Sequence, residues 1–297
     1  MSQVNVTTSI SRRGLGRTLR IVRIETDNLC SRINKMLILI KVTGGILWLM
    51  KRIHDKGDWT YGINPVLEAI KAGRRINTVY VYDQSRQHLN TIIDAAKTHG
   101  IPVKFETKEF FDGRFHKGHQ GVAASAGKRK TISIDELLNI PAQKKEVPFF
   151  IVLDSIEDPR NFGAILRVAD AARVHGVVFQ SHRSAGITPV TAKASAGALE
   201  HVNLAETVNI KHAMEKMRKA DIMLIGAEAG TDKTLWDIDM RGPLALVVGS
   251  EGEGLRRTVR EMCDMTVSLP IKGTVNSLNV SVATGILAYE VMRQRRS

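Results

Sequence analysis

Three polar, glycine-containing segments each follow a continuous apolar run, and they carry the residues best suited to chemistry. The first, 154–163, leads into a helical pattern that contains Arg167. The second is 248–254 and the third extends over 269–281. Ligands of open α/β sheets bind at the carboxyl ends of the strands. Three such segments at three strand ends therefore predict one shared pocket.

The glycine-rich segment 248–254 does not match the common phosphate-binding loops. It is neither GxGxxG nor a P-loop, because no Lys-Ser/Thr pair follows its glycines. Glu251 and Glu253 would repel a phosphate, so the segment favours a neutral or cationic ligand bound through backbone groups. ATP and dinucleotides are therefore disfavoured. The alternative interpretation is a tight strand-to-helix connection that binds nothing.

Alternating strand and helix patterns position these segments. Continuous apolar runs, as a parallel sheet buried on both faces requires, lie at 149–153, 177–179, 222–225, 244–248 and 265–269. Helical patterns separate them at about 161–173, 189–199, 211–219, 255–263 and 279–294. The pattern predicts an α/β domain with a parallel sheet over 149–297.

A smaller α/β unit is predicted at 57–127, before a linker at 128–148. Its elements are a helix that begins at Asn64-Pro65, a strand at 78–82, a helix at 87–99, and strands at 101–105 and 121–126. The unit has only a small positive excess of charge, whereas proteins that stack single-stranded bases hold the backbone in a positively charged groove. Stacking on single-stranded bases is therefore not its obvious mode of RNA binding.

Residues 1–56 hold most of the excess positive charge: their net charge is +8, and that of residues 57–297 is +5. We find no helical or strand period in them. Three interpretations stay open: a disordered arm, upstream sequence translated from a misplaced start, or a transit peptide, whose Arg- and Ser-rich composition they share. The arginines from Arg12 to Arg32 and the run Lys128–Lys130 either follow RNA phosphates or are solvated surface.

Composition excludes several classes of protein. The 297 residues are 43% hydrophobic and 25% charged, which is ordinary for globular domains. No apolar run reaches the roughly 20 residues that span a bilayer, so we expect no membrane contact. Cys30 and Cys263 cannot build a disulfide framework or a zinc site, which suits a reducing cytoplasm. His116 and His119 have no further ligands near them in sequence, so we expect no metal. The expected surface histidines are His175, His182, His201 and His212.

A family resemblance rests on three motifs in order: Asn161-x-Gly163-x-x-x-Arg167, Gly249-x-Glu251-Gly252 and Ser277-Leu278-Asn279-x-Ser281. Together they resemble the motifs of the SpoU (TrmH-type) RNA ribose methyltransferases of the SPOUT superfamily, and the resemblance covers residues 150–297. Residues 61–126 resemble the small, L30e-like substrate-binding domain of one branch. Residues 1–56 have no counterpart in this pattern.

The resemblance implies a deep trefoil knot and S-adenosylmethionine as cofactor. The residues it assigns to the cofactor are Gly226, Ala227, Glu228, Gly249, Leu269, Ile271 and Leu278. It implies 2′-O-methylation of a guanosine in the peptidyl-transferase region of 23S rRNA, with the free rRNA or a pre-ribosomal particle as the partner. The alternatives are a tRNA ribose methyltransferase, a resistance-type rRNA methylase, or an RNA-binding ribosome-assembly module without catalysis.

The resemblance also implies roles for individual side chains. Arg167 is the predicted catalytic residue, either orienting the RNA or acting as a minority base, since a guanidinium normally stays protonated. Asn161 fixes Arg167 or the ribose, or caps its helix. Glu251 is expected to hydrogen-bond Arg167 or the substrate. Ser277 and Asn279 contact ligand or cap the last helix.

Family members pair through their knot regions, so the resemblance implies a homodimer in which Arg167 reaches the cofactor of the other copy. The candidate surface lies on the final helix at Val280, Ala283, Gly285, Leu287 and Val291. The pattern alone favours an intrachain core for this stripe.

Overall fold

The computed structural model describes residues 4–9, 21–26, 37–42, 45–50, 58–115, 118–182, 184–275 and 277–296. His116, Cys30 and the arginines at 12, 13, 17, 20 and 32 lie outside the described residues. The chain divides into two compact units, 1–56 and 57–297.

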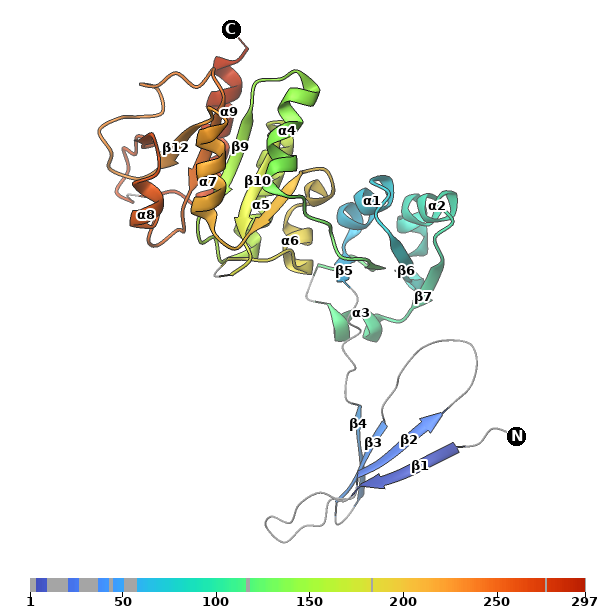
Figure 1. Ribbon diagram of the computed structural model, residues 1–297. Coiled ribbons are helices and arrows are strands. Elements are labelled where there is room, and N and C mark those ends of the chain that lie inside the picture. The colour runs from blue at the N-terminus through green and yellow to red at the C-terminus, as the bar shows by residue number, and fades with distance from the viewer. Residues whose placement is uncertain are drawn as a thin grey trace. The chain divides into compact units, whose positions relative to one another are not determined.

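Two antiparallel strand pairs occur in the first unit, where we predicted no strand (Figure 1). β1 (Val4–Ser9) pairs with β2 (Ile21–Thr26), and β3 (Leu37–Val42) pairs with β4 (Gly45–Met50). Valine, isoleucine and leucine fill much of these strands, and β-branched residues fit a pleated surface well. The expectation of an arm without strands is thus wrong for these four segments. The other interpretations of residues 1–56 stay predictions.

The smaller α/β part of the second unit has a four-stranded sheet in the order β5-β8-β6-β7. Its elements are β5 (Asp58–Tyr61), α1 (Ile63–Lys71), β6 (Ile76–Tyr82), the 3₁₀ helix η1 (Asp83–Leu89), α2 (Asn90–Thr98), β7 (Val103–Glu106), α3 (Lys108–Arg114) and β8 (Val122–Ala126). Helices α1 and α2 pack on one face of the sheet, and an aromatic cluster with α3 covers the other. We did not predict β5 and α3.

The larger part is built on six parallel strands in the order β11-β10-β9-β13-β12-β14. The strands are β9 (Phe149–Leu153), β10 (Gly176–Gln180), β11 (Leu204–Thr207), β12 (Met223–Ala227), β13 (Leu244–Val248) and β14 (Met265–Val267). The helices are α4 (Ile134–Lys144), α5 (Pro159–Ala171), α6 (Pro189–Ala194), the 3₁₀ helix η2 (Ala198–Glu200), α7 (Ile210–Lys219), α8 (Arg257–Arg260) and α9 (Val280–Gln294). The predicted parallel α/β domain is confirmed.

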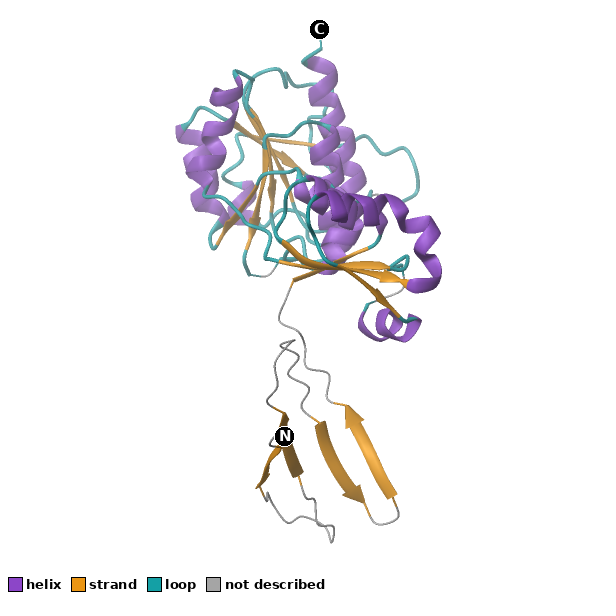
Figure 2. Cartoon of the chain, turned by 90° about the vertical axis from the view of Figure 1, so that its right-hand side faces the viewer, coloured by secondary structure: helices purple, strands orange, loops and turns teal. Residues whose placement is uncertain are grey.

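Helices cover both faces of this sheet (Figure 2). Successive side chains of a strand point to opposite faces. Ile151 of β9 accordingly packs with α5 and α9, whereas its neighbour Val152 packs with α4 and α7. Every residue of β9 and β13 is buried, which explains why these strands read as continuous apolar runs. Among the described residues, no helix combines the length and apolarity needed to cross a bilayer.

The predicted linker 128–148 is the largest difference in this region. Residues 134–144 form α4, which begins at a capping box between Ser133 and Glu136. Its Leu137 is completely buried in the sheet's second face. Pro141, which we predicted to lie in the linker, is part of this helix. The short edge strand β11 was not predicted either.

Charged side chains join the two parts of the second unit. Arg74 Nη1 contacts Glu200 Oε1 at 2.8 Å, and both side chains are less than a tenth exposed. Arg129 Nε lies 3.7 Å from Glu200 Oε2 and donates to the carbonyl of Leu199. Burial lowers the pKa of Arg129, and Glu200 opposes that shift. The small domain is therefore held against η2 by an ion cluster with little access to water.

His175 is buried, which corrects the expectation that it lies at the surface. Its Nδ1 accepts a hydrogen bond from the Phe149 backbone N–H at 3.1 Å, and its Nε2 contacts a Glu146 carboxylate oxygen at 2.9 Å. An Nδ1 that accepts from the backbone carries no proton, so the fold selects the neutral ring. Burial lowers the pKa of His175 below its usual 6.5, and Glu146 partly offsets this.

We expect the free energy of unfolding to fall between pH 7.5 and pH 5.5, in part through His175. The unfolded chain takes up a proton near pH 6.5, whereas the folded ring does so only at lower pH. This contribution is therefore complete above pH 6.5 and is lost as the pH falls below it. Urea unfolding at the two pH values measures it. His175→Gln should flatten the pH dependence, and an unchanged slope would contradict the assignment.

Candidate functional site

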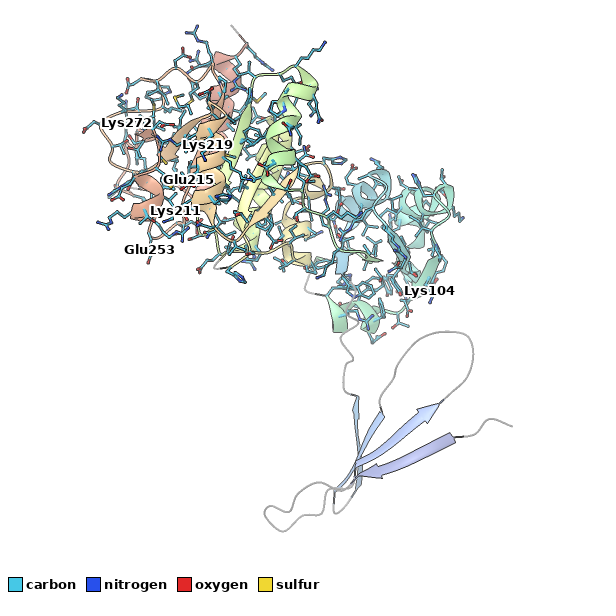
Figure 3. All side chains as sticks on the ribbon, in the orientation of Figure 1. Lys104, Lys211, Glu215, Lys219, Glu253 and Lys272 are labelled. Carbon is cyan, nitrogen blue, oxygen red and sulfur yellow. The ribbon has the colours of Figure 1, made fainter. Side chains whose placement is uncertain are left out.

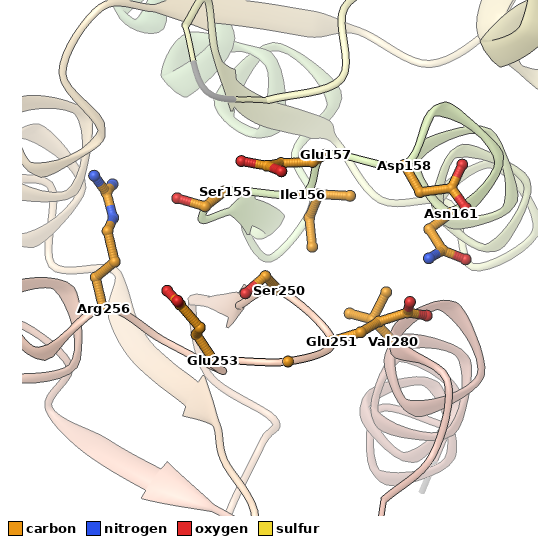
Figure 4. A pocket seen from close by; sticks show the side chains of 11 residues that line it. Ser155, Ile156, Glu157, Asp158, Asn161, Ser250, Glu251, Glu253, Arg256 and Val280 are labelled. Carbon is orange, nitrogen blue, oxygen red and sulfur yellow. The ribbon is translucent and has the colours of Figure 1, made fainter.

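A pocket of about 510 Å³ lies at the carboxyl edge of the larger sheet, where the sequence predicts one. It is formed by the segments that follow β9 and β13 and by the start of α9 (Figure 4). Its lining residues are Ser155, Ile156, Glu157, Asp158, Asn161, Ser250, Glu251, Gly252, Glu253, Arg256 and Val280.

Asn279 joins the three motifs beside this pocket. Its Nδ2 donates to Asn161 Oδ1 at 3.0 Å and to a carboxylate oxygen of Glu251. Its Oδ1 accepts from the backbone N–H of Ser281 at 2.9 Å and so caps α9. The cap fixes which way the amide faces, and the two Nδ2 bonds then place Asn161 and Glu251 together. Asn161, Glu251 and Asn279 form what we call the amide–carboxylate cluster.

The start of α5 explains two motif residues. Asp158, not Asn161, caps the helix by accepting from the Arg160 backbone N–H, so the capping alternative for Asn161 is wrong. Asn161 instead sits in the first turn, nearly buried, with its side chain in the cluster. Gly163 is required by packing, because a Cβ there would lie 2.7 Å from the Thr191 carbonyl oxygen.

Arg167 lies apart from the cluster. It is exposed on α5 and is not among the pocket residues. No hydrogen bond or ion pair of Arg167 occurs in the part of the chain that the structure describes. Six residues along an α-helix turn the side chain about 120° away and displace it by about 9 Å. The expected contacts of Arg167 with Asn161 and Glu251 are therefore absent within one chain, and Glu251 bonds Asn279 instead.

The glycine loop is held closed by its own backbone. The Ser250 and Gly254 backbones bond each other in both directions, at 3.1 and 3.0 Å. A Cβ at Gly249 would lie only 2.1 Å from the Gly254 carbonyl oxygen, so no other residue fits without moving the loop. This close return turns Glu251 and Glu253 outward from the loop, and both line the pocket.

The predicted cofactor residues lie on segments that end neighbouring strands. Gly226 and Ala227 end β12, and Leu269 and Ile271 follow β14. Glu228 has one carboxylate oxygen 3.0 Å from Arg260 Nη1. Its other oxygen, Oε2, is buried without a hydrogen-bond partner among the described residues. Buried carboxylate oxygens normally find a donor, so Oε2 has an acceptor position that the described residues do not fill.

The remaining predicted site residues are more exposed. Leu278 and Ile271 are 44% and 37% exposed, which is high for aliphatic side chains. Ser277 is exposed and makes no hydrogen bond within the described ranges; its neighbour Asn276 lies outside them. Among the described residues, no group of three or more His, Cys, Asp or Glu side chains could hold a metal ion.

An anchored arginine in the pocket wall was not predicted. Arg256 Nε donates to Asp154 Oδ1 at 2.7 Å, and its backbone N–H donates to Asp154 Oδ2 at 2.9 Å. Its Nη2 donates to Gln180 at 2.8 Å. Asp154 is completely buried at the end of β9. The sequence did carry a signal for this pair. Asp154 directly follows an all-apolar strand, and a carboxylate buried there needs a charged partner.

Two family models match the chain. Residues 148–289 match the SpoU rRNA Methylase family, and residues 59–131 match RNA 2′-O ribose methyltransferase substrate binding. The chain belongs to the SpoU family. The three motifs that the cluster joins all lie within the first of these ranges. Residues 1–58 lie outside both.

Relatives and solved structures agree with this assignment. The TrmH family tRNA/rRNA methyltransferase YacO of Bacillus subtilis is 38% identical over 82% of this chain and 98% of its own length. The 23S rRNA (guanosine-2′-O-)-methyltransferase RlmB of Escherichia coli is 37% identical over 79% and 98%. The crystal structure of the SpoU methyltransferase AviRb of Streptomyces viridochromogenes with AdoMet matches with a TM-score of 0.70 at 25% identity, over 80% and 90%.

Proposed function

We propose that this SpoU family member transfers a methyl group from S-adenosylmethionine to the 2′-hydroxyl of a guanosine in 23S rRNA. The observation that carries the proposal is the amide–carboxylate cluster, which unites side chains of three separate motifs at the ligand-binding edge of the sheet. The RlmB relatives are 23S rRNA (guanosine-2′-O-)-methyltransferases, and the guanosine and the rRNA of the proposal come from them. A cytoplasmic location, the L30e-like relationship of the small domain and the rRNA target region stay predictions.

The residues present fit the proposed cofactor. Exposed aliphatic side chains of Ile271 and Leu278 suit an apolar ligand surface, and Glu228 Oε2 offers an acceptor for a ribose hydroxyl or an amine. The acidic glycine loop is compatible with the positive sulfonium. When bound, S-adenosylmethionine supplies the methyl group as an electrophile. The protein's own task is to hold the 2′-hydroxyl in line with it.

Glu228→Gln is expected to weaken S-adenosylmethionine binding about tenfold, because a buried acceptor loses its charge. Calorimetric titration of the purified protein measures the affinity without RNA or turnover. Glu261→Gln is the matched control, since Glu261 is an exposed glutamate paired with Arg257. Equal affinities in the wild type and Glu228→Gln would remove Glu228 from the proposed cofactor site.

The cluster orients the acceptor. Asn279 occupies one Glu251 oxygen and the Asn161 carbonyl, which leaves the second Glu251 oxygen and Asn161 Nδ2 for the ribose. Glu251 then accepts a hydrogen bond from the 2′-hydroxyl and draws its proton away from the attacking oxygen. The cluster lacks a cation for the RNA backbone, which the distant Arg167 would provide.

A second copy of the chain would bring Arg167 into the site. The outward face of α9 carries Val282, Ile286 and Tyr289, each at least 42% exposed, one to two turns apart. Val280, Leu287 and Val291, which we predicted as the pairing stripe, are buried within the chain instead. The homodimer we propose therefore uses the opposite face of α9, and closed two-fold pairs are the commonest assembly.

Mixing two inactive variants tests the shared site. One chain carries Arg167→Ala, and the other carries Gly249→Ala, whose Cβ would collide with the glycine loop. Heterodimers should regain partial activity, because one of their two sites combines an intact arginine with an intact loop. Ile286→Asp should give monomers by sedimentation. Mixed dimers that form but stay inactive would show that each chain supplies its own Arg167.

A trefoil knot is also part of the proposal. Segment 228–243 connects β12 to β13, and within it Thr234 pairs in parallel with Ser268 beyond β14. Later in the chain, Gln294 of α9 bonds Ile238 and Met240 of the same segment. Segment 228–243 thus contacts two parts of the chain that come later in the sequence. A knot in which the C-terminal region passes through an earlier loop requires contacts of this kind.

Incubation with labelled S-adenosylmethionine and separate rRNA and tRNA pools tests the proposed RNA class. We expect label in 23S rRNA alone. Label in tRNA would favour the tRNA ribose methyltransferase alternative. No label in either pool would favour the non-catalytic assembly module.

A further inference from the structure

The pocket has two chemically different ends (Figure 4). Asn161 and Glu251, which belong to the amide–carboxylate cluster, lie at one end. The side chains of Glu157, Glu253 and Arg256 lie toward the other end and line it. A volume of about 510 Å³ is within the usual range for small-ligand sites. A nucleoside with its ribose at the cluster would place its base toward Arg256.

Arg256 is held in position before any ligand arrives. Two of its donors and its backbone N–H are occupied by Asp154 and Gln180. Its Nη1 makes no hydrogen bond in the described part of the chain, and the side chain is 39% exposed. The completely buried Asp154 thus fixes a guanidinium in the pocket wall with one donor group available.

The charge of the pocket argues against a phosphate at this end. Four carboxylates line the pocket as a whole, against the single guanidinium of Arg256. They belong to Glu157, Asp158, Glu251 and Glu253. Arg256 is already neutralised by Asp154. An anion would therefore be repelled, whereas a neutral group with several hydrogen-bond donors and one acceptor would be favoured.

Guanine is the nucleobase that matches this pattern. Its base-pairing edge carries two adjacent donors, N1–H and the 2-amino group, beside the acceptor O6. Adenine, cytosine and uracil each present one donor group on that edge. A carboxylate accepts both guanine donors with its two oxygens, and arginine donates readily to O6.

We propose that Glu253 and Arg256 read the target guanine, Glu253 accepting from N1–H and the 2-amino group and Arg256 donating to O6. The inference rests on the proposed methylation of guanosine and adds the residues that select the base. Glu253 sits near the tip of the closed loop Ser250–Gly254, and Arg256 follows two residues after that loop. This assignment also gives the Glu253 carboxylate of the loop a role in binding RNA, although RNA is itself an anion.

Base analogues provide the test. Synthetic RNA fragments carry guanosine, inosine or 2-aminopurine riboside at the methylated position. Inosine lacks the 2-amino group, and 2-aminopurine lacks O6 and N1–H. For the wild type we expect kcat/KM to fall roughly 10- to 100-fold with either analogue, as for a lost hydrogen bond to a charged group. In Glu253→Gln the guanosine-to-inosine ratio should shrink at least fivefold.

Two further variants sharpen the test. Arg256→Lys keeps a positive partner for Asp154 and should mainly reduce discrimination against 2-aminopurine. Glu215→Gln changes an exposed carboxylate on α7 (Figure 3) that does not line the pocket, and it should keep the wild-type ratios.

The inference is overturned if Glu253→Gln methylates guanosine and inosine RNA with the wild-type ratio. It is also overturned if Glu253→Gln loses S-adenosylmethionine affinity by calorimetry, because the pocket end would then belong to the cofactor. A wild type that methylates no guanosine fragment would contradict the proposed function itself. Methylation of guanosine with unchanged ratios contradicts the base-reading inference alone.

Discussion

Arg167→Ala is expected to lower kcat for methyl transfer by about 100- to 1000-fold, as for other side chains that contact only the transition state. Folding and S-adenosylmethionine affinity should stay unchanged. Arg167 is exposed on α5 and has no hydrogen-bond partner in the described ranges, so its loss removes no contact within the chain. Thermal unfolding, calorimetry and single-turnover kinetics measure the three quantities.

Arg173→Ala is the control for Arg167, because Arg173 is another exposed arginine that lies just beyond the end of α5. It should keep wild-type activity. Arg167→Lys separates charge from hydrogen-bond geometry, since lysine lacks the planar group that binds phosphate in two places. Retained activity in Arg167→Ala would exclude the catalytic role, and a large drop in melting temperature or cofactor affinity would make the residue structural.

Glu200→Ala is expected to lower the free energy of unfolding by about 3–5 kcal/mol. It leaves the Arg74 guanidinium, which is 8% exposed, without its carboxylate. Arg129 loses the same neighbour at 3.7 Å. Urea unfolding followed by circular dichroism measures the change, provided that unfolding is reversible.

Glu206→Ala is the matched control, because Glu206 is an exposed glutamate on the nearby edge strand β11. It should change the free energy of unfolding by less than about 0.5 kcal/mol. Equal stability of the two variants would mean that water reaches Arg74 when Glu200 is removed. The small domain would then be held by its apolar contacts instead.

Much of the fold could be predicted because its strands are buried on both faces. β9 and β13 read as uninterrupted apolar runs, and the structure places them side by side in the parallel sheet. Elements with a weaker pattern were missed. Only half of β11 is buried. α4 has a capping box but contains Pro141, which reads as a break unless the packing of Leu137 is known.

The site was predictable in outline. Carboxyl ends of parallel strands share an edge, so Asn161, Glu251 and Asn279 were expected to meet there, and they do. Sequence spacing could not show that Asn279 is the residue joining the other two. It also could not show that Arg256 and Asp154 pair across 102 positions, because such a contact depends on the arrangement of β9 and β13.

Nucleoside analysis of 23S rRNA tests the central claim most directly. Unmodified 23S rRNA is incubated with the protein and S-adenosylmethionine, digested to nucleosides and analysed by mass spectrometry, with alkaline hydrolysis to locate the methyl group. We expect 2′-O-methylguanosine at one alkali-resistant linkage, and none with Arg167→Ala. A methyl group on a base, on another nucleoside or on no nucleoside at all would contradict the account.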